Sequence, residues 1–449
     1  MKDYSDLIAK WSGLAQEADV IDQGLYGRYE VKRGLRELSG KGVLAGLTRI
    51  GEVHSYIIDE GETVPQPGQL IYRGIDIDDL VNGFRKDQRL GFEETAYLLL
   101  MGDLPSKAEL DKFSEVIGEY RILPEGFIRD MIMGLPSKDM MNVLARSVLA
   151  LYTFDDNPDD ISIDNIIKQS LRLISTMPLL AVYGYQSCQY YQGKSSLVIH
   201  SPRTDLSTAE NILYMLRHNN EYTPLEAQLL DLALVLHAEH GGGNNSSFTT
   251  HVVTSSGTDT YSTIAAAIGS LKGPRHGGAN IKVADMLEDL KTEVADWEDD
   301  AQISDYIERL LEKKAFDKQG LVYGIGHAVY SLSDPRAVIF KEYVEALAKE
   351  KGLTDEFNLY SRVEGLAPKI ISEKKKMYKG VSANVDFYSG FVYRMLGIPR
   401  ELYTPLFAIS RTVGWCAHRI EELNNGSKII RPAYRSVAKR REYTPLDER

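Results

Sequence analysis

Residues 223–247, TPLEAQLLDLALVLHAEHGGGNNSS, carry the clearest folding signal in the chain. Thr223, Pro224 and Glu226 supply a helix N-cap, a first-turn proline and a carboxylate that can bond back to the cap. The apolar residues that follow keep the 3.6-residue helical period: Leu225, Leu229, Leu232, Ala233 and Leu236. The stretch predicts a helix that ends in two histidines and is stopped by the glycine run 241–243.

Most of the remaining chain also reads as helix, and strand signals lie mainly near the N-terminus. Ser106 and Glu109 form a capping box ahead of a helix in SKAELDKFSEVIGEYR. Turn residues such as Gly51 and 65–68 separate three short runs that predict strands: VLAGLTRIGEV (43–53), HSYIIDE (54–60) and QLIYRG (69–74). We therefore expect a mainly α-helical fold with a small N-terminal β-hairpin region.

Composition narrows the class of protein. The 449 residues, 43% of them hydrophobic and 26% charged, indicate a globular chain with more than one domain. A formal charge of −12 argues against binding to nucleic acid or an anionic membrane. The two cysteines, Cys188 and Cys416, are too few for a disulfide framework. With neither a signal-peptide pattern nor a membrane-spanning run, we expect a cytoplasmic protein.

Four glycine-flanked clusters place a histidine or an aspartate where backbone can approach a ligand closely. In chain order they are HAEHGGGNNSS (237–247), GPRHGGAN (273–280), GIGHAVYSLSDPR (324–336) and NVDFYSG (384–390). One such cluster is a weak signal, because a histidine beside glycine is more often a cap or a turn residue. Four in one chain indicate a ligand site.

Together these clusters resemble the citrate synthase family, in order and in spacing. Three further segments fit the resemblance: LIYRGIDIDDL (70–80), SRTVGWCAH (410–418) and KIIRP (428–432). The resemblance implies a two-domain helical fold and a working homodimer. We expect residues 1–278 and 385–449 to form a large helical domain, and 279–384 to form a small domain inserted in it.

The resemblance implies that three residues do the chemistry. His276 would hold the thioester oxygen as the enol forms, His327 would be the general acid, and Asp386 would remove the proton from the acyl methyl group. A carboxylate is a weak base in water, so Asp386 needs an enclosed, desolvated site. Helix capping is the structural alternative for both His276 and Asp386.

The resemblance assigns four residues to oxaloacetate: His240, Arg336, Arg411 and Arg431. A guanidinium can hold a carboxylate through two parallel hydrogen bonds, which lysine cannot do. Arg431 is expected to reach the site of the partner subunit. A surface salt bridge is the alternative for Arg336, and His237 is expected to pack at the helix end.

The coenzyme A side departs from the family pattern. Ser331 stands where many members carry a basic residue, and the segment before Asp386 reads KGVSAN instead of an aromatic, proline-rich run. Lys379, or the lysines at 374–376, could supply the missing positive charge, and we assign Lys379 to coenzyme A binding.

The expected reaction joins acetyl-CoA to oxaloacetate and hydrolyses the thioester to give citrate and coenzyme A. A 2-methylcitrate synthase using propionyl-CoA is the alternative, because one methylene is worth only about 1–3 kcal/mol of discrimination. No metal or redox cofactor is expected. Two rival hypotheses are a metal-dependent hydrolase using the HAEH region with His251 and a non-catalytic helical scaffold.

Overall fold

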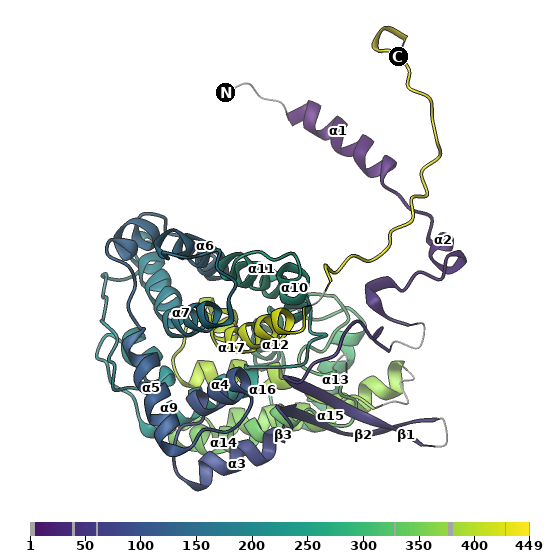
Figure 1. Ribbon diagram of the computed structural model, residues 1–449. Helices are drawn as coiled ribbons and strands as arrows, with labels where there is room; N and C mark the ends of the chain where they lie inside the picture. The colour runs from purple at the N-terminus through teal and green to yellow at the C-terminus, as the bar shows by residue number, and fades with distance from the viewer. Residues whose placement is uncertain are drawn as a thin grey trace. The chain divides into compact units, whose positions relative to one another are not determined.

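The computed structural model describes residues 5–37, 41–59, 62–326, 329–375, 380–426 and 428–448. The chain separates into two compact units. Residues 47–429 form the larger unit, and the two chain ends, 1–46 and 430–449, form the smaller one. Figure 1 shows that helices make up most of the larger unit, which confirms the expected fold class.

A small antiparallel sheet opens the larger unit. Its strands are β1 (Gly51–Asp59), β2 (Glu62–Tyr72) and β3 (Ile75–Asp76), in the order β1-β2-β3. The hairpin was predicted, but a turn at 65–68 was wrong, since β2 runs through these residues and Pro65 pairs opposite Tyr56. The β1–β2 register shifts between His54 and Tyr56, so Gln66, Pro67 and Gly68 lie in an irregular stretch of the ladder where proline is tolerated, and β3 pairs only with Ile71 and Tyr72.

Helices form the rest of the larger unit. Their bounds are α3 (Ile77–Lys86), α4 (Phe92–Met101), α5 (Lys107–Glu119), η2 (Ile128–Met133), α6 (Met140–Leu151), η3 (Tyr152–Phe154), α7 (Ile163–Tyr191), α8 (Thr208–Leu216), α9 (Pro224–His237), α10 (Asn245–Thr254), α11 (Thr260–Lys272), α12 (Ala279–Glu293), α13 (Asp300–Leu311), α14 (Pro335–Glu350), α15 (Thr354–Lys375), α16 (Val385–Met395), η4 (Arg400–Leu402) and α17 (Tyr403–Asn424).

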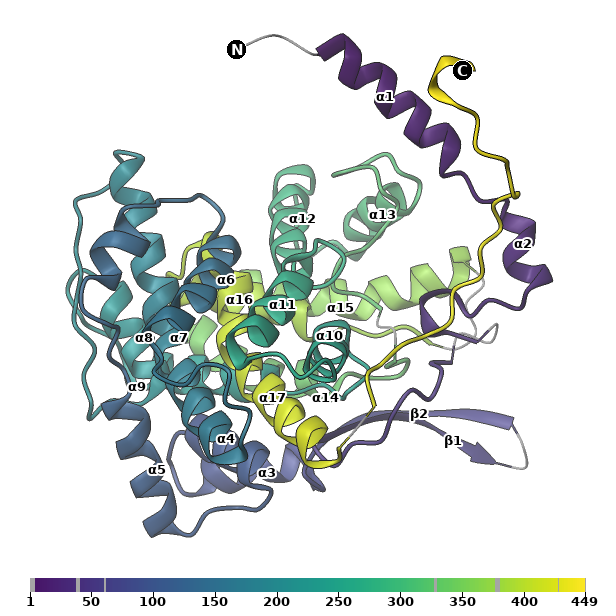
Figure 2. The same ribbon diagram turned by 45° about the horizontal axis from the view of Figure 1, so that its top comes forward.

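Helix α17 lies at the centre of this unit. Every residue from Tyr403 to Ile420 is buried, polar ones included, as expected of a helix surrounded by protein on all sides. It packs against α4, α7, α9, α10 and α11, and Figure 2 shows it in yellow among these elements. Side chains on α17 can therefore reach groups from several parts of the chain.

The predicted helix starts are confirmed. Capping boxes with both reciprocal hydrogen bonds open α5, at Ser106 and Glu109, and α9, at Thr223 and Glu226. Helix α9 ends at His237. The next residues, Ala238 and Glu239, are buried, and Arg411 on α17 donates to the carbonyl oxygen of His237.

The smaller unit holds α1 (Ser5–Ala18), α2 (Gln23–Arg28), η1 (Arg33–Leu35), the extended C-terminal segment and η5 (Leu446–Glu448). Within it, the guanidinium carbon of Arg435 lies 4.3 Å from the ring centre of Tyr29. The division into a large and a small helical domain at 278/279 and 384/385 stays a prediction. In the described part of the chain, no helix has the length and apolar character needed to cross a membrane.

Candidate active site

The ring of Phe407, on α17, brings together three groups from distant segments. Its centre lies 4.8 Å from that of His237 and 6.3 Å from that of His276, and the guanidinium carbon of Arg411 lies 4.8 Å from it. Helix α9, the turn before α12 and helix α17 therefore meet here. Two of the three groups, His276 and Arg411, are predicted site residues.

The ring of Tyr330 gathers a second pair in the same way. His240 contacts it edge-on with ring centres 5.6 Å apart, and the guanidinium carbon of Arg336 lies 5.8 Å from its centre. His240 and Arg336 are both buried. The loop after α9 and the start of α14 thus converge on one side chain.

Arg411 is a buried cation with unused hydrogen-bonding capacity. Its Nε donates to the carbonyl oxygen of His237 at 2.7 Å, which fixes the guanidinium. Nη1 and Nη2 are buried and have no hydrogen-bond partner among the described residues. Burial lowers the pKa of Arg411 to about 10, so it stays positive at neutral pH. A buried, unpaired guanidinium is costly without an anion, so this site is suited to a carboxylate.

Arg336 is held by a buried carboxylate. Its Nε and Nη2 donate to Asp334 at 3.0 and 2.7 Å, and Asp334 also accepts from the backbone N–H groups of Arg336 and Val385. Since Asp334 is 1% exposed and Arg336 3% exposed, the alternative of a surface salt bridge is wrong. Asp334 thereby ties the first turn of α14 to the first turn of α16.

Asp386 lies in the first turn of α16 but does not cap it. Asn384 is the N-cap and accepts a hydrogen bond from the backbone N–H of Asp386, so the capping alternative is wrong. The Asp386 side chain is half-buried. Desolvation raises its pKa to about 6 despite the opposing charges of Arg336 and Arg411. A carboxylate with this pKa is well placed to act as a base near neutral pH.

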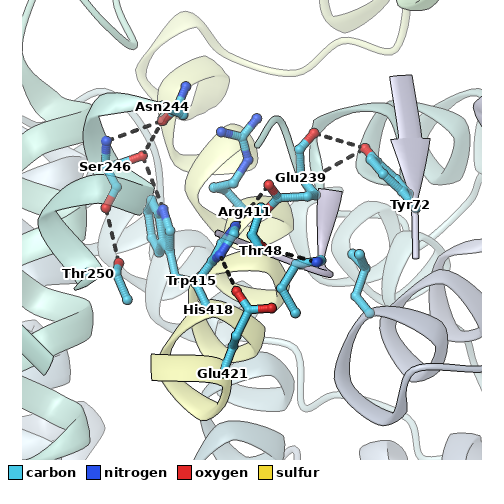
Figure 3. Close-up of polar contacts among 12 residues, drawn as sticks. Thr48, Tyr72, Glu239, Asn244, Ser246, Thr250, Arg411, Trp415, His418 and Glu421 are labelled. Atoms are coloured by element: carbon cyan, nitrogen blue, oxygen red, sulfur yellow. Dashed lines mark hydrogen bonds and ion pairs between the residues drawn. The ribbon is translucent and has the colours of Figure 1, made fainter. Parts of the chain in front are cut away.

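His276 is a neutral histidine in a hydrogen-bonded turn. Its Nε2 lies 3.1 Å from Ser246 Oγ. The Ser246 oxygen also accepts from Trp415 Nε1 at 3.1 Å, and the Ser246 hydroxyl donates to Asn244 Oδ1 at 2.9 Å (Figure 3). Burial and the charge of Arg411 lower the pKa of His276 to about 4. Turned toward His276 Nε2 instead of Asn244 Oδ1, the Ser246 hydroxyl would leave the ring proton on Nδ1, where it can be donated to a ligand.

His276 also does not cap a helix, because Gly278 is the N-cap of α12. That alternative is therefore wrong. His237 packs as predicted: it is the last residue of α9, is 1% exposed, and lies 2.8 Å through Nδ1 from the carbonyl oxygen of Ala233.

Glu239 lies between the two histidines of the HAEH motif and anchors the loop. Tyr72 lies on the predicted LIYRG strand. Its hydroxyl donates to the carbonyl oxygens of Val235 and Glu239 and accepts from the Glu239 N–H at 3.2 Å. The Glu239 carboxylate pairs with His418 Nε2 at 3.0 Å (Figure 3). His240 is thus carried on a fixed backbone.

Three predicted site residues stay predictions. His327 and Lys379 lie outside the described residues. Arg431 is exposed and belongs to the smaller unit. Among the other candidates on the coenzyme A side, Lys374 pairs with Glu308 and Glu312 at 2.7 and 2.9 Å, so its charge is already balanced.

Sequence reasoning missed four side chains that shape the site: Asp334, Ser246, Phe407 and Tyr330. Asp334 and Ser246 stand inside quoted motifs, and the pattern Asp-Pro-Arg is itself a helix-start signal. Phe407 carries no chemical group that a motif search would single out.

The rival metal site at the HAEH region is not formed. The one group of three potential metal ligands found among the described residues joins His251 to His418 and Glu421, without His237 or His240.

Comparisons with known proteins agree with this geometry. The family model described as "Citrate synthase, C-terminal domain" matches residues 37–433. A citrate synthase of Haloferax volcanii is 35% identical over 427 residues, covering 94% of this chain and 99% of that protein. The 2-methylcitrate synthase 1 of Corynebacterium glutamicum is 31% identical over 429 residues, with the same coverage of 94% and 99%.

One solved structure is the ternary complex of carboxymethyl coenzyme A and oxaloacetate with citrate synthase from Thermoplasma acidophilum. It aligns with a TM-score of 0.75 and 27% identity over 93% of this chain and 99% of that chain. The family match spans most of the sequence and includes each motif that carries a described site residue. The chain therefore belongs to the citrate synthase family.

Proposed function

We propose that the protein condenses acetyl-CoA with oxaloacetate and hydrolyses the resulting thioester to release citrate and coenzyme A. Two features together carry the proposal. Asp386 is a half-buried carboxyl with a raised pKa, and Arg411 has buried Nη groups without a hydrogen-bond partner among the described residues. One group suits proton removal from carbon, and the other suits a carboxylate substrate.

In the proposed first step, Asp386 takes a proton from the acetyl methyl group while His276 donates a hydrogen bond to the thioester oxygen. The electron pair of the broken C–H bond moves toward that oxygen. A neutral His276 whose Nδ1 carries the proton stabilises charge that develops only in the transition state. This tautomer requires the Ser246 hydroxyl to turn from Asn244 Oδ1 to His276 Nε2, which lies 3.1 Å away.

In the second step the enol carbon attacks the carbonyl carbon of oxaloacetate. His240, Arg336 and Arg411 would hold the oxo acid, together with Arg431 from the second subunit, and His327 would donate a proton to the carbonyl oxygen as it becomes a hydroxyl. Asp334 fixes the Nε edge of Arg336. Arg336 therefore presents Nη1 and the remaining Nη2 hydrogen to substrate. Water then cleaves the thioester, and coenzyme A leaves as the thiol.

The wider assignment follows the same proposal. The working unit is a homodimer in the cytoplasm that serves the tricarboxylic acid cycle, with Lys379 near the coenzyme A phosphates. Residues 279–384 act as the small domain that closes over the substrates and excludes water. No step in this chemistry calls for a metal or redox cofactor.

Acetyl-CoA is the favoured acyl donor. The citrate synthase of H. volcanii is 35% identical to this chain and the 2-methylcitrate synthase of C. glutamicum is 31% identical. Propionyl-CoA remains the second candidate, because the pocket must discriminate a single methylene, worth about 1–3 kcal/mol.

The deciding experiment measures oxaloacetate-dependent release of coenzyme A thiol from acetyl-CoA and, in parallel, from propionyl-CoA. Wild type should release thiol only when oxaloacetate is present, and Asp386→Ala should abolish release. Asp164→Ala is the matched control, since Asp164 is an exposed aspartate in the first turn of α7. A faster propionyl-CoA rate would overturn the acyl assignment, and equal activity in wild type and Asp386→Ala would overturn the mechanism.

A further inference from the structure

Behind the loop that carries His240, three ligand groups from two helices converge. His251 lies on α10, and His418 and Glu421 lie one turn apart on α17. One ligating atom of each lies within 4.8 Å of the others. Figure 3 shows His418 and Glu421 side by side. None of the three takes part in the proposed reaction.

A carboxylate orients each of the two imidazole rings. His251 Nδ1 lies 2.7 Å from Glu422 Oε2, and His418 Nε2 lies 3.0 Å from Glu239 Oε1. In a neutral ring the carboxylate keeps the proton on the nitrogen facing it, which leaves the lone pair on the other nitrogen. Histidines that bind metals are oriented by carboxylates in this way.

The two ligand atoms on α17, which face each other, make no hydrogen bond. His418 Nδ1 and Glu421 Oε2 are buried and have no hydrogen-bond partner in the described part of the chain. They face each other at 3.8 Å and form an ion pair when His418 is protonated (Figure 3). Gly242 lies against the two imidazole rings and places no side chain on them. A Cβ at that position would lie 3.3 Å from His251 Nε2 and 3.5 Å from His418 Cε1.

The charge around the site is mixed. Glu239, Glu421 and Glu422 bring three carboxylates to two imidazole rings, while Arg411 acts on Glu239 and Arg73 acts on both Glu239 and Glu421. A divalent ion would share with these arginines in balancing the carboxylates. The competing arrangement is a proton on His418: burial alone lowers the pKa of this ring, but the Glu239 and Glu421 carboxylates raise it to about 9.

We propose that His251 Nε2, His418 Nδ1 and Glu421 Oε2 bind one Zn²⁺ ion, with water at a fourth position. Two imidazoles and a carboxylate suit zinc better than magnesium or calcium. The ion would tie α10 to α17. It would also fix the segment before β1, because Glu421 Oε1 already accepts from the Arg49 backbone N–H at 2.6 Å. This role is structural and independent of the proposed function.

The test uses the full-length protein freed of metal with a chelator. Zn²⁺ is titrated against a competing chromogenic chelator, and Co²⁺ is added separately to record the absorption of its coordination sphere. We expect one Zn²⁺ per chain, a rise in melting temperature on binding, and loss of this binding in His251→Gln and Glu421→Gln. His218→Gln is the control, because His218 is an exposed histidine elsewhere, and it should bind as wild type does.

Glu422→Gln provides a second test that leaves all three ligands in place. Loss of the outer carboxylate should weaken zinc affinity by about 10–100-fold. A wild-type protein that binds no Zn²⁺, or binding that is unchanged in His251→Gln and Glu422→Gln, would mean that the cluster holds a proton only. Thiol release from acetyl-CoA should persist in the metal-free protein, so failure of the zinc site and failure of the proposed function can be told apart.

Discussion

The carboxyl of Asp386 determines how the proposed activity should depend on pH. Only its ionised form can accept a proton from carbon, and desolvation raises its pKa to about 6. We therefore expect kcat/KM for acetyl-CoA to be level above this pH and to fall about tenfold per pH unit below it. A pH-rate profile measured at saturating oxaloacetate would test this. An acid limb centred near the ordinary aspartate value of 3.8 would contradict it.

The same burial predicts a cost in stability. Because the folded-state pKa lies above the unfolded one, the protonated form is favoured by folding, and stability is lost as pH rises from about 4 to about 6. Asp386→Asn removes the buried charge and should stabilise the protein at pH 7 by up to about 3 kcal/mol while abolishing activity. Urea unfolding at neutral pH and at a pH below 4 would show this gain and its disappearance. A gain that is equal at both values would point to a cause other than charge.

Motifs predicted the residues that carry chemical groups better than those that position them. His240, His276, Arg336, Arg411 and Asp386 were all proposed because glycine or a helix-start pattern flanks them or because the family resemblance names them. The groups that hold them depend on contacts between distant segments. The Trp415 and Ser246 pair, 169 residues apart in sequence, is one example.

At the scale of helices, Asp334 is the side chain that links Arg336, proposed to bind oxaloacetate, to the helix that carries Asp386, the proposed base. It caps α14, pairs with Arg336, and accepts from the Val385 N–H at the start of α16, one residue before Asp386. Asp334→Asn keeps an oxygen for the cap but removes the charge that holds the buried guanidinium.

We expect Asp334→Asn to destabilise the protein by about 3–5 kcal/mol, as for other broken buried ion pairs, and to raise KM for oxaloacetate while lowering kcat. Restoring the charge with Asp334→Glu should recover part of the activity. Asp299→Asn, the same change at the N-cap of α13, should have little effect on either constant. Asp334→Asn with wild-type kinetics would mean that the link between α14 and α16 has no functional role.

Helix starts were predictable because their signals are local. Thr223, Pro224 and Glu226 lie within four residues, and the capping box of α9 formed as expected. Strand β2 was not predicted to run through 65–68, because whether Pro65 and Pro67 interrupt a strand depends on its pairing with β1, and the register of that pairing shifts between His54 and Tyr56.

At the scale of the whole molecule, the position of Arg431 decides whether one chain can form a complete site. Arg431 is exposed in the smaller unit, in an extended C-terminal segment. The family resemblance implies that it serves the second subunit. The sequence motif identified Arg431. Which subunit's site it completes depends on how the chains assemble, and a local sequence pattern does not encode the assembly.

Mixing two inactive variants would test this arrangement. Asp386→Ala and Arg431→Ala should each be inactive as homodimers. In a mixed dimer, one site loses both groups, while the other combines Asp386 from one chain with Arg431 from the other and is intact. Random exchange of subunits should therefore restore about a quarter of wild-type activity, since half of the dimers are mixed and each has one working site. Unfolding and refolding the two chains together, with each chain refolded alone as the control, supplies the measurement. If Arg431 served its own chain, every site in the mixture would lack one of the two groups, and no activity would return.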